Sequence, residues 1–280
     1  MHLVIQGAEI ATRDLKELAR LSGAAAIDRL SATAFRLCGA QPAAGIAELC
    51  AGAKLDHGFV PAGRRLGAFR LLVMDMDSTL ITMETIDELA DMIGIKAEVA
   101  AITAQAMRGE IEYDESLRRR LALLKGLDES ALQRVYDERL RFSPGAERML
   151  ARARAAGIKT LLVSGGFSYI TDRLKTRVRL DYTHSNLLEI ADGKLSGAVI
   201  GRIVNADAKR DALQRVATEL GASRAQIAGV GDGANDLKFL AECGVSVAWR
   251  AKPVVRDKTT YALNHSGLDA MLYLLSAEQD

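Results

Sequence analysis

The sequence predicts an α/β protein in which a doubly wound parallel sheet follows a small α+β N-terminal domain and contains a helical cap insertion. From residue 70 onward, short apolar segments alternate with helical patterns, as expected for a parallel sheet covered on both faces. The segment 81–142 is almost wholly helical by periodicity and too long for an ordinary crossover. The predicted core strands are residues 70–74, 159–163, 227–230 and 245–248.

The composition favours a soluble cytoplasmic protein with a packed core. The chain has 280 residues, 49% of them hydrophobic, and its 37 basic and 36 acidic residues give a net charge of +1. This balance, without a basic stripe, argues against a nucleic-acid partner. No membrane span and no signal segment are expected. The cysteines Cys38, Cys50 and Cys243 show no metal or disulfide spacing, and we interpret them as small buried residues.

Residues 1–66 form the predicted N-terminal domain. Alternation and helical periodicity predict strands at 2–5 and 34–37 and helices at 13–21 and 46–54. Thr12 is the predicted N-cap of the first helix. A loose connection follows, with Gly58, Pro61, Gly63 and Gly67. We place the boundary there and assign 67–280 to a second domain, which we expect to fold by itself.

Two excursions from the predicted sheet have distinct patterns. The helical segment 81–142 comes soon after the first core strand, so we expect it to form a mobile cap over a site at the end of that strand. Residues 187–203 contain Asp192-Gly193 between β-prone segments, which predicts a hairpin.

Asp75 and Asp77 directly follow the first core strand. In an open parallel sheet, ligands bind outside the carboxyl ends of the strands. Two acids there can divide the work of phosphoryl transfer, with Asp75 as nucleophile and Asp77 as general acid and base. A solvated pair of aspartates at a strand end is the alternative.

Two further segments favour a phosphate site. Ser164 and Gly165 follow the strand at 159–163, where a hydroxyl and a backbone N–H can hold phosphate oxygens. Lys209 lies near the start of a helix for which Asp207 is the predicted N-cap. A lysine in the first turn opposes the helix dipole, and a bound phosphate would remove that conflict. An exposed first-turn lysine is the alternative.

The run Gly231-Asp232-Gly233-Ala234-Asn235-Asp236 follows the strand at 227–230. Its carboxylates suit Mg²⁺, which prefers oxygen ligands. A glycine-rich turn with an aspartate cap is the alternative.

Arg120 is the predicted specificity residue of the cap. At 100° per residue it lies within an apolar stripe that includes Leu117, Leu121, Leu123, Leu124 and Leu127, whereas Arg119 lies opposite. An arginine on an apolar face needs an anion, and a planar guanidinium suits a substrate carboxylate. A salt bridge to a cap glutamate is the alternative. Tyr113 and Met107 are expected to shape the pocket wall or to pack in the core.

The ordered set D-x-D-S-T, S-G-G, Lys209 and G-D-G-x-N-D resembles the haloacid dehalogenase superfamily of aspartate-nucleophile phosphotransferases. The stretches DMDSTLITMETIDELA, SLRRRLALLKGL, LLVSGGF, NADAK and VGDGANDL resemble its phosphoserine phosphatase family more closely. The resemblance extends from about Leu71 to the C-terminus. The N-terminal domain resembles an abbreviated amino-acid-sensing (ACT-like) domain, for which a purely structural or dimer-forming role stays open.

The resemblance implies hydrolysis of O-phospho-L-serine through an aspartyl-phosphate, the last step of serine biosynthesis. It implies Mg²⁺ held by the Asp75 carboxylate, the Asp77 backbone carbonyl and the Asp232 carboxylate, with Asp236 orienting ligands or waters. It also implies that Glu84 pairs with the substrate ammonium and that Asn235 binds substrate.

Three alternatives to this activity stay open. They are transfer of the phosphoryl group to an alcohol such as homoserine, another small-molecule phosphatase activity of the superfamily, and a catalytically inactive amino-acid-binding regulator. The only partner expected besides the small-molecule substrate is a second copy of the chain, in a homodimer, by family analogy.

Overall fold

The computed structural model describes residues 1–277 and begins with a four-stranded antiparallel sheet. Its strands lie in the order β2-β3-β1-β4, and with two helices they make the βαββαβ arrangement of ferredoxin-like folds. The elements are β1 (His2–Gln6), α1 (Thr12–Ser22), β2 (Ala26–Ser31), β3 (Ala34–Cys38), α2 (Ile46–Gly52) and β4 (Asp56–Val60).

Three details of this region differ from the sequence-based prediction. Strands β2 and β4 are additional, so the βαββαβ pattern is complete rather than abbreviated. Thr12 is the first residue of α1, and its N-cap is Ala11, which makes no side-chain hydrogen bond. Gly58 lies inside β4 instead of a loose connection. A Cβ at this position would lie 2.7 Å from Tyr261 Cδ1 and 2.8 Å from Leu274 Cδ2, so the glycine permits close packing.

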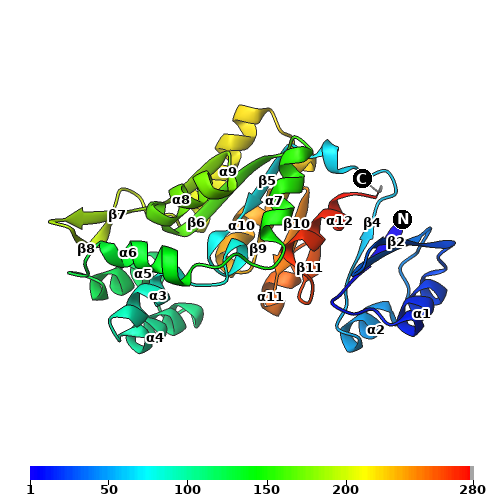
Figure 1. The fold of residues 1–280 in the computed structure, drawn as a ribbon, viewed down its shortest axis with the longest axis horizontal. Helices are drawn as coiled ribbons and strands as arrows, with labels where there is room; N and C mark the ends of the chain where they lie inside the picture. The colour runs from blue at the N-terminus through cyan, green and yellow to red at the C-terminus, as the bar shows by residue number, and fades with distance from the viewer. Residues whose placement is uncertain (278–280) are drawn as a thin grey trace. The chain divides into compact units, whose positions relative to one another are not determined.

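Helices α1 and α2 cover one face of this sheet (Figure 1). Because side chains alternate along a strand, Leu3, Ile5 and Leu37 point to that face together. Their core is completed by buried residues of the helices and loops, which are Leu15, Leu18, Ala40, Ile46, Cys50 and Leu55.

The opposite face of the sheet is also buried. Val4 and Val60 lie on it and are fully buried. The segment after residue 260 packs here, since Tyr261 donates a hydrogen bond to the Phe59 carbonyl oxygen at 2.7 Å. The N-terminal sheet therefore shares a core with the C-terminal part of the chain.

A second sheet has seven strands in the order β11-β10-β9-β5-β6-β7-β8. The pairs β10–β11, β10–β9 and β6–β7 are parallel, and β7–β8 is antiparallel. The strand order reverses beside β5, which is where doubly wound sheets bind ligands. The strands are β5 (Leu71–Met74), β6 (Lys159–Phe167), β7 (Tyr182–Ala191), β8 (Lys194–Ile200), β9 (Ile227–Gly231), β10 (Val245–Trp249) and β11 (Tyr261–Leu263). The four predicted core strands are confirmed.

The chain divides into two compact units. The first comprises Met1–Leu72, Pro144–Lys159 and Glu219–Asp280, and the second comprises Val73–Ser143 and Thr160–Thr218. The first unit contains α7 (Ala146–Ala155), α10 (Leu237–Ala241), α11 (Pro253–Arg256) and α12 (Met271–Leu275). The predicted domain boundary at residue 67 stays a prediction.

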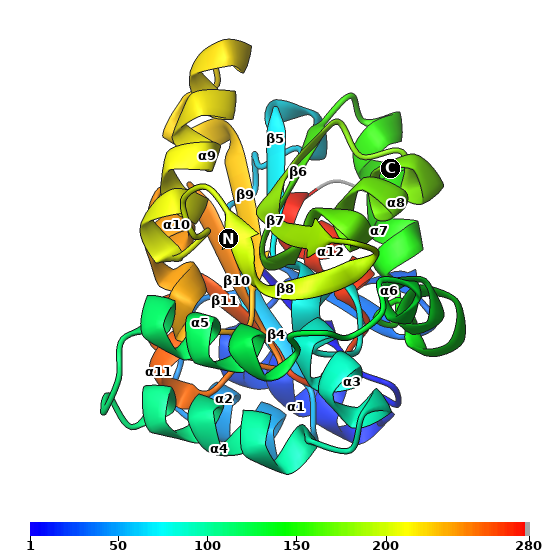
Figure 2. The ribbon, with the colours of Figure 1, turned by 90° about the vertical axis from the view of Figure 1, so that its left-hand side faces the viewer.

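The second unit contains the cap insertion, whose helical character is confirmed. Its helices are α3 (Thr85–Met92), α4 (Lys96–Met107), α5 (Tyr113–Leu123) and α6 (Ser130–Arg134), followed by a turn of helix at Val135–Arg139. Helices α4 and α5 lie side by side, and α5 contacts β8 (Figure 2). The unit also contains α8 (Ser168–Val178) and all but the last two residues of α9 (Ala206–Leu220).

The predicted hairpin is confirmed as β7–β8. Asp192 and Gly193 form its turn with φ values of 51° and 72°, the positive values that a tight hairpin requires. The first half of β7 was not predicted, because Tyr182-Thr183-His184-Ser185-Asn186 is polar although it pairs with β6.

No helix in the described part of the chain is long and apolar enough to cross a membrane. Cys50 and Cys243 are buried as predicted, and burial raises the pKa of the Cys50 thiol to about 12. Cys38 is only half-buried and donates a hydrogen bond to Asp28 at 3.2 Å.

Candidate active site

Asp75 is the first residue after β5, and its side chain is buried. Its Oδ1 accepts a hydrogen bond from the Met76 N–H at 2.8 Å and lies 2.8 Å from the Lys209 Nζ. The turn that follows is sharp, because Ser78 adopts a positive φ of 55°. Asp77 precedes Ser78 in this turn, and the positive charge of Lys209 acts on both Asp77 and Asp75, so the two carboxyl groups lie at one site, as cooperating carboxyl groups must.

Asp77 has the environment of a proton donor. Its Oδ1 accepts hydrogen bonds from the Thr85 hydroxyl at 2.7 Å and the Thr85 N–H at 3.3 Å. Burial, and then the charge of Glu84, raise the pKa of Asp77 to about 8, although the Thr85 hydrogen bonds and Lys209 act in the opposite direction. A carboxyl group with this pKa is protonated at neutral pH and can give its proton to a leaving group.

Ser164, Gly165 and Gly166 lie at an irregularity near the end of β6, where the pairing with β7 shifts register. The buried Ser164 Oγ accepts a hydrogen bond from the Gly166 N–H at 2.8 Å, so its own proton stays available. A Cβ at Gly166 would lie 2.9 Å from Asp77 Oδ2, and one at Gly165 would collide with the Tyr113 hydroxyl. Glycine is needed at both positions because the site is compact.

Lys209 lies in the first turns of α9 and is 1% exposed. The alternative of an exposed surface lysine is therefore wrong. Asp207 was predicted to be the N-cap of α9, but it lies inside the helix, which begins at Ala206. The Asn205 Oδ1 accepts hydrogen bonds from the Asp207 N–H at 3.1 Å and the Ala208 N–H at 3.2 Å, so Asn205 has that role.

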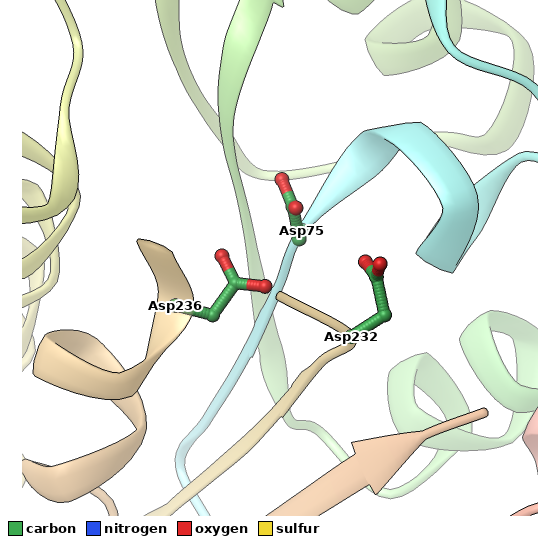
Figure 3. Close-up of side chains that lie close together, drawn as sticks. All are labelled: Asp75, Asp232 and Asp236. Carbon is green, nitrogen blue, oxygen red and sulfur yellow. The ribbon is translucent and has the colours of Figure 1, made fainter. Parts of the chain in front are cut away.

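The acidic residues after β9 complete a carboxylate cluster. One carboxylate oxygen from each of Asp75, Asp232 and Asp236 lies within 4.8 Å of the other two. Figure 3 shows the three side chains. The fully buried Asp236 also accepts a hydrogen bond from the Gly233 N–H at 3.1 Å. Asn235 is half-buried in the short turn Ala234–Asp236. Three oxygen donors at this spacing fit a hard divalent cation, and Asp236 belongs to the same cluster as the predicted ligand Asp232.

Arg120 lies on the inner side of α5, as its helical position predicts. It is half-buried, and the one hydrogen bond from its side chain within residues 1–277 goes to the Ser116 carbonyl oxygen at 3.4 Å. Its guanidinium forms no salt bridge with a described glutamate, so that alternative is not seen. Arg119 instead pairs with Glu115 at 2.7 Å on the outside.

Glu84 lies close to this arginine. Its Oε1 accepts a hydrogen bond from the Ser78 hydroxyl at 2.6 Å. Burial raises the pKa of Glu84, whereas the Ser78 hydrogen bond and the positive charges of Arg120 and Lys209 lower it. The Glu84 carboxyl group and a guanidinium that has no salt bridge within residues 1–277 thus occur together at the site, which is the combination that an amino acid's two charged groups require.

Several neighbouring residues depart from the prediction or were missed. Tyr113 is at the site, where burial raises its pKa to about 12, but Met107 is 62% exposed and Leu123 is 40% exposed. Thr85 and Asn186 were not predicted. Asn186 makes hydrogen bonds to Gly165 and Val204, which are 21 and 18 residues away, and no local pattern reveals such partners.

The class of protein follows from comparison with family models. Residues 69–244 match the haloacid dehalogenase-like hydrolase family, and residues 3–46 match a domain of unknown function, DUF4072. The chain therefore belongs to the haloacid dehalogenase-like hydrolase family.

Individual relatives place the chain more narrowly within that family. It is 50% identical over 75% of its length to a phosphoserine phosphatase of Polaromonas sp., covering 92% of that protein. It is 48% identical over 78% of its length to the phosphoserine phosphatase of Albidiferax ferrireducens, covering 94% of that protein. Within its family, the chain groups with the phosphoserine phosphatases.

Solved structures agree with this placement. A probable phosphoserine phosphatase from Vibrio cholerae is 34% identical with a TM-score of 0.86, and the match covers 99% of this chain and 86% of that one. A haloacid dehalogenase family hydrolase from Salmonella enterica serovar Typhi is 33% identical with a TM-score of 0.88, and 98% of each chain is covered.

Proposed function

We propose that this chain is a phosphatase that hydrolyses O-phospho-L-serine to L-serine and phosphate through an aspartyl-phosphate on Asp75. The observation that best supports this is the buried ion pair of Asp75 with Lys209, 2.8 Å apart, beside an Asp77 whose pKa is raised to about 8. The two carboxyl groups thus differ in protonation, as a nucleophile and a proton donor must.

In the first half of the reaction, an Asp75 carboxylate oxygen attacks phosphorus and the bond from phosphorus to the seryl oxygen breaks. Asp77 gives its proton to that oxygen, and serine leaves. Lys209, the Ser164 hydroxyl and the Gly165 N–H are the groups that would hold the phosphate oxygens.

In the second half, water attacks the aspartyl-phosphate. Asp77, now a carboxylate, takes a proton from that water. Inorganic phosphate leaves, and Asp75 returns to its carboxylate form. The proton donated in the first half is thereby restored, and Asp77 can act again.

Magnesium is the proposed cofactor. The Asp75, Asp232 and Asp236 carboxylates have the donor type and spacing that fit it. When bound, the ion neutralises charge between the phosphate group and the nucleophilic carboxylate. We keep the Asp77 backbone carbonyl as a further proposed ligand.

Substrate selection is assigned to Arg120 and Glu84. The half-buried Arg120 guanidinium would bind the substrate carboxylate in a planar two-pronged arrangement. Glu84 would accept the substrate ammonium, and Asn235 is proposed as a further substrate contact. The names of the relatives support phosphoserine as the substrate.

The cellular setting is likewise proposed. Release of serine from phosphoserine would be the last step of serine biosynthesis, carried out in the cytoplasm. A homodimer, and the lack of nucleic-acid or membrane partners, remain predictions of the same kind.

The decisive experiment measures phosphate release from O-phospho-L-serine with Mg²⁺ and after treatment with a chelator. We expect turnover with Mg²⁺, loss of turnover after chelation, and recovery when Mg²⁺ is restored. A parallel assay with homoserine distinguishes hydrolysis from phosphoryl transfer to an alcohol. Formation of phosphohomoserine at the expense of free phosphate would identify a phosphotransferase. No phosphate release under either condition would overturn the proposed function.

A further inference from the structure

Both polar atoms of the Asn205 side-chain amide make hydrogen bonds. Its Oδ1 caps α9 by accepting hydrogen bonds from the Asp207 and Ala208 N–H groups, at 3.1 and 3.2 Å. Its Nδ2 donates a hydrogen bond to the Asp114 Oδ1 at 3.0 Å. Asp114 lies in the first turn of α5, a helix of the cap. One half-buried amide therefore joins the start of α9 to the start of α5.

The two joined helices contain different parts of the site. Helix α9 contains Lys209, whose backbone N–H donates to the Asn205 carbonyl oxygen at 2.9 Å and whose ammonium contacts Asp75. Helix α5 contains Tyr113 and Arg120. The hydrogen bond from Asn205 to Asp114 thus fixes the proposed specificity residue relative to the phosphate-binding lysine.

A second asparagine holds the same region from the other side. The buried Asn186 donates from Nδ2 to the Gly165 carbonyl oxygen at 2.8 Å, and its Oδ1 accepts from the Val204 N–H at 2.8 Å. The Tyr113 hydroxyl in turn lies directly against Gly165. The contacts form a closed ring from Gly165 through Asn186, the segment 204–205 and α5, and back to Gly165.

Electrostatics also favour this arrangement. The starts of α5 and α9 each have a partial positive charge from unpaired N–H groups. The Asp114 carboxylate lies in the first turn of α5 and accepts a hydrogen bond from the residue that caps α9. It therefore offsets the repulsion between the two helix ends.

We propose that Asn205 is a positioning residue, and that its hydrogen bond to Asp114 is a latch that holds cap helix α5 against the phosphate site. This inference rests on the proposed function, because the reaction that the latch would accelerate is the hydrolysis of phosphoserine. It closes the cap over the substrate so that Arg120 and Lys209 engage the same molecule.

The matched variants separate the latch from helix capping. Asn205→Asp keeps a good N-cap for α9 but places a carboxylate against Asp114 without a donor. Asp114→Ala removes the latch and leaves the cap of α9 untouched. We expect kcat/KM for phosphoserine to fall about tenfold to a hundredfold in either variant, since small displacements of positioned groups have effects of this size. Glu115→Ala, on the outside of α5, is the control and should change kcat/KM less than about threefold.

Rescue by a reversed hydrogen bond is the sharpest test. The double variant N205D/D114N exchanges the amide and the carboxylate, so the donor lies on α5 and the acceptor on α9. We expect it to recover kcat/KM to within about threefold of the parent. The latch would be excluded if the losses in kcat/KM of the two single variants multiplied in the double variant, or if Asn205→Asp had the kinetics of the parent. Asn205 would then be a helix cap and nothing more.

Hydrogen exchange provides a readout that does not depend on turnover. In the full-length protein, amides of residues 113–123 should exchange faster in Asn205→Asp and Asp114→Ala, and at the parent rate in the double variant. Unchanged exchange in both single variants would contradict the latch. If the parent does not hydrolyse phosphoserine, the proposed function fails, whereas the exchange pattern still decides whether the latch exists.

Discussion

Asp75 and Asp77 are two residues apart, yet their surroundings give them opposite roles. Asp75 is paired with the Lys209 ammonium, which favours the carboxylate form. Desolvation of the Asp77 carboxyl group and the negative charge of Glu84 both favour its protonated form. The division into nucleophile and acid therefore comes from neighbours and not from residue type.

Asp75→Asn is expected to abolish turnover in a folded protein. The amide keeps the shape of the side chain but is a poor nucleophile, so kcat should fall more than about a thousandfold, equivalent to more than about 4 kcal/mol of barrier. Loss of the ion pair with Lys209 lowers the stability of the fold, whereas removal of one of three clustered negative charges raises it, so the two effects on stability oppose each other. Phosphate release and circular dichroism would be measured together. A folded variant that retains more activity would exclude Asp75 as the nucleophile.

Arg120→Ala is expected to affect substrates with a carboxylate selectively. Removing one partner of a buried charge pair typically costs about 2 to 5 kcal/mol, so kcat/KM for phosphoserine should fall roughly thirtyfold to a few thousandfold. Phosphoethanolamine, which lacks the carboxylate, should be a poor substrate of the parent and lose little more in the variant.

Arg119→Ala provides the matched control for this experiment. Arg119 is on the outside of α5 and pairs with Glu115, so its removal should change neither substrate by more than a few fold. Equal losses for both substrates in Arg120→Ala would mean that Arg120 supports the cap's structure instead of binding the carboxylate.

At the scale of elements, β4 is tied to the loop after β11 by a single carboxylate. The buried Asp56 accepts hydrogen bonds from the N–H groups of Asn264, His265 and Ser266 at 2.7, 3.0 and 2.8 Å. A carboxylate that accepts hydrogen bonds from three consecutive backbone N–H groups fixes the conformation of the loop.

Asp56→Asn is expected to destabilise the protein by about 2 to 4 kcal/mol, because an amide offers one acceptor oxygen and places an N–H against backbone donors. Urea unfolding would measure the change. Asp257→Asn, on the exposed surface of the same unit, is the control and should stay within about 0.5 kcal/mol of the parent. A similar small effect for both would show that the loop holds its shape without Asp56.

At the scale of the whole molecule, the N-terminal sheet is buried on both faces, with α1 and α2 on one and the C-terminal segment on the other. This revises the expectation that residues 67–280 fold by themselves. The close approach at Gly58 means that Tyr261 and Leu274 would lose their cover if the sheet were absent.

A chain shortened to begin at Leu66 is therefore expected to be insoluble or strongly destabilised. Exposing Tyr261 and Leu274 alone would cost about 3 to 6 kcal/mol, at about 1.5 to 3 kcal/mol for each side chain. Solubility and the thermal midpoint would be compared with those of the full chain. A soluble shortened chain with the parent's thermal midpoint and phosphatase activity would restore the original expectation of an independent second domain.

The sequence by itself determined the apolar strands, the helical cap, the strand-end aspartates and the inward phase of Arg120. Each of these depends on residues within a few positions, where periodicity and strand ends are visible. Only the tertiary structure decided the raised pKa of Asp77, the burial of Lys209, the bridging roles of Asn186 and Asn205, and the glycine inside β4. The hydrogen bonds of Asn186 and Asn205 and the close packing at Gly58 depend on partners far along the chain. The desolvation that raises the pKa of Asp77 and the burial of Lys209 exist only after the segments have packed.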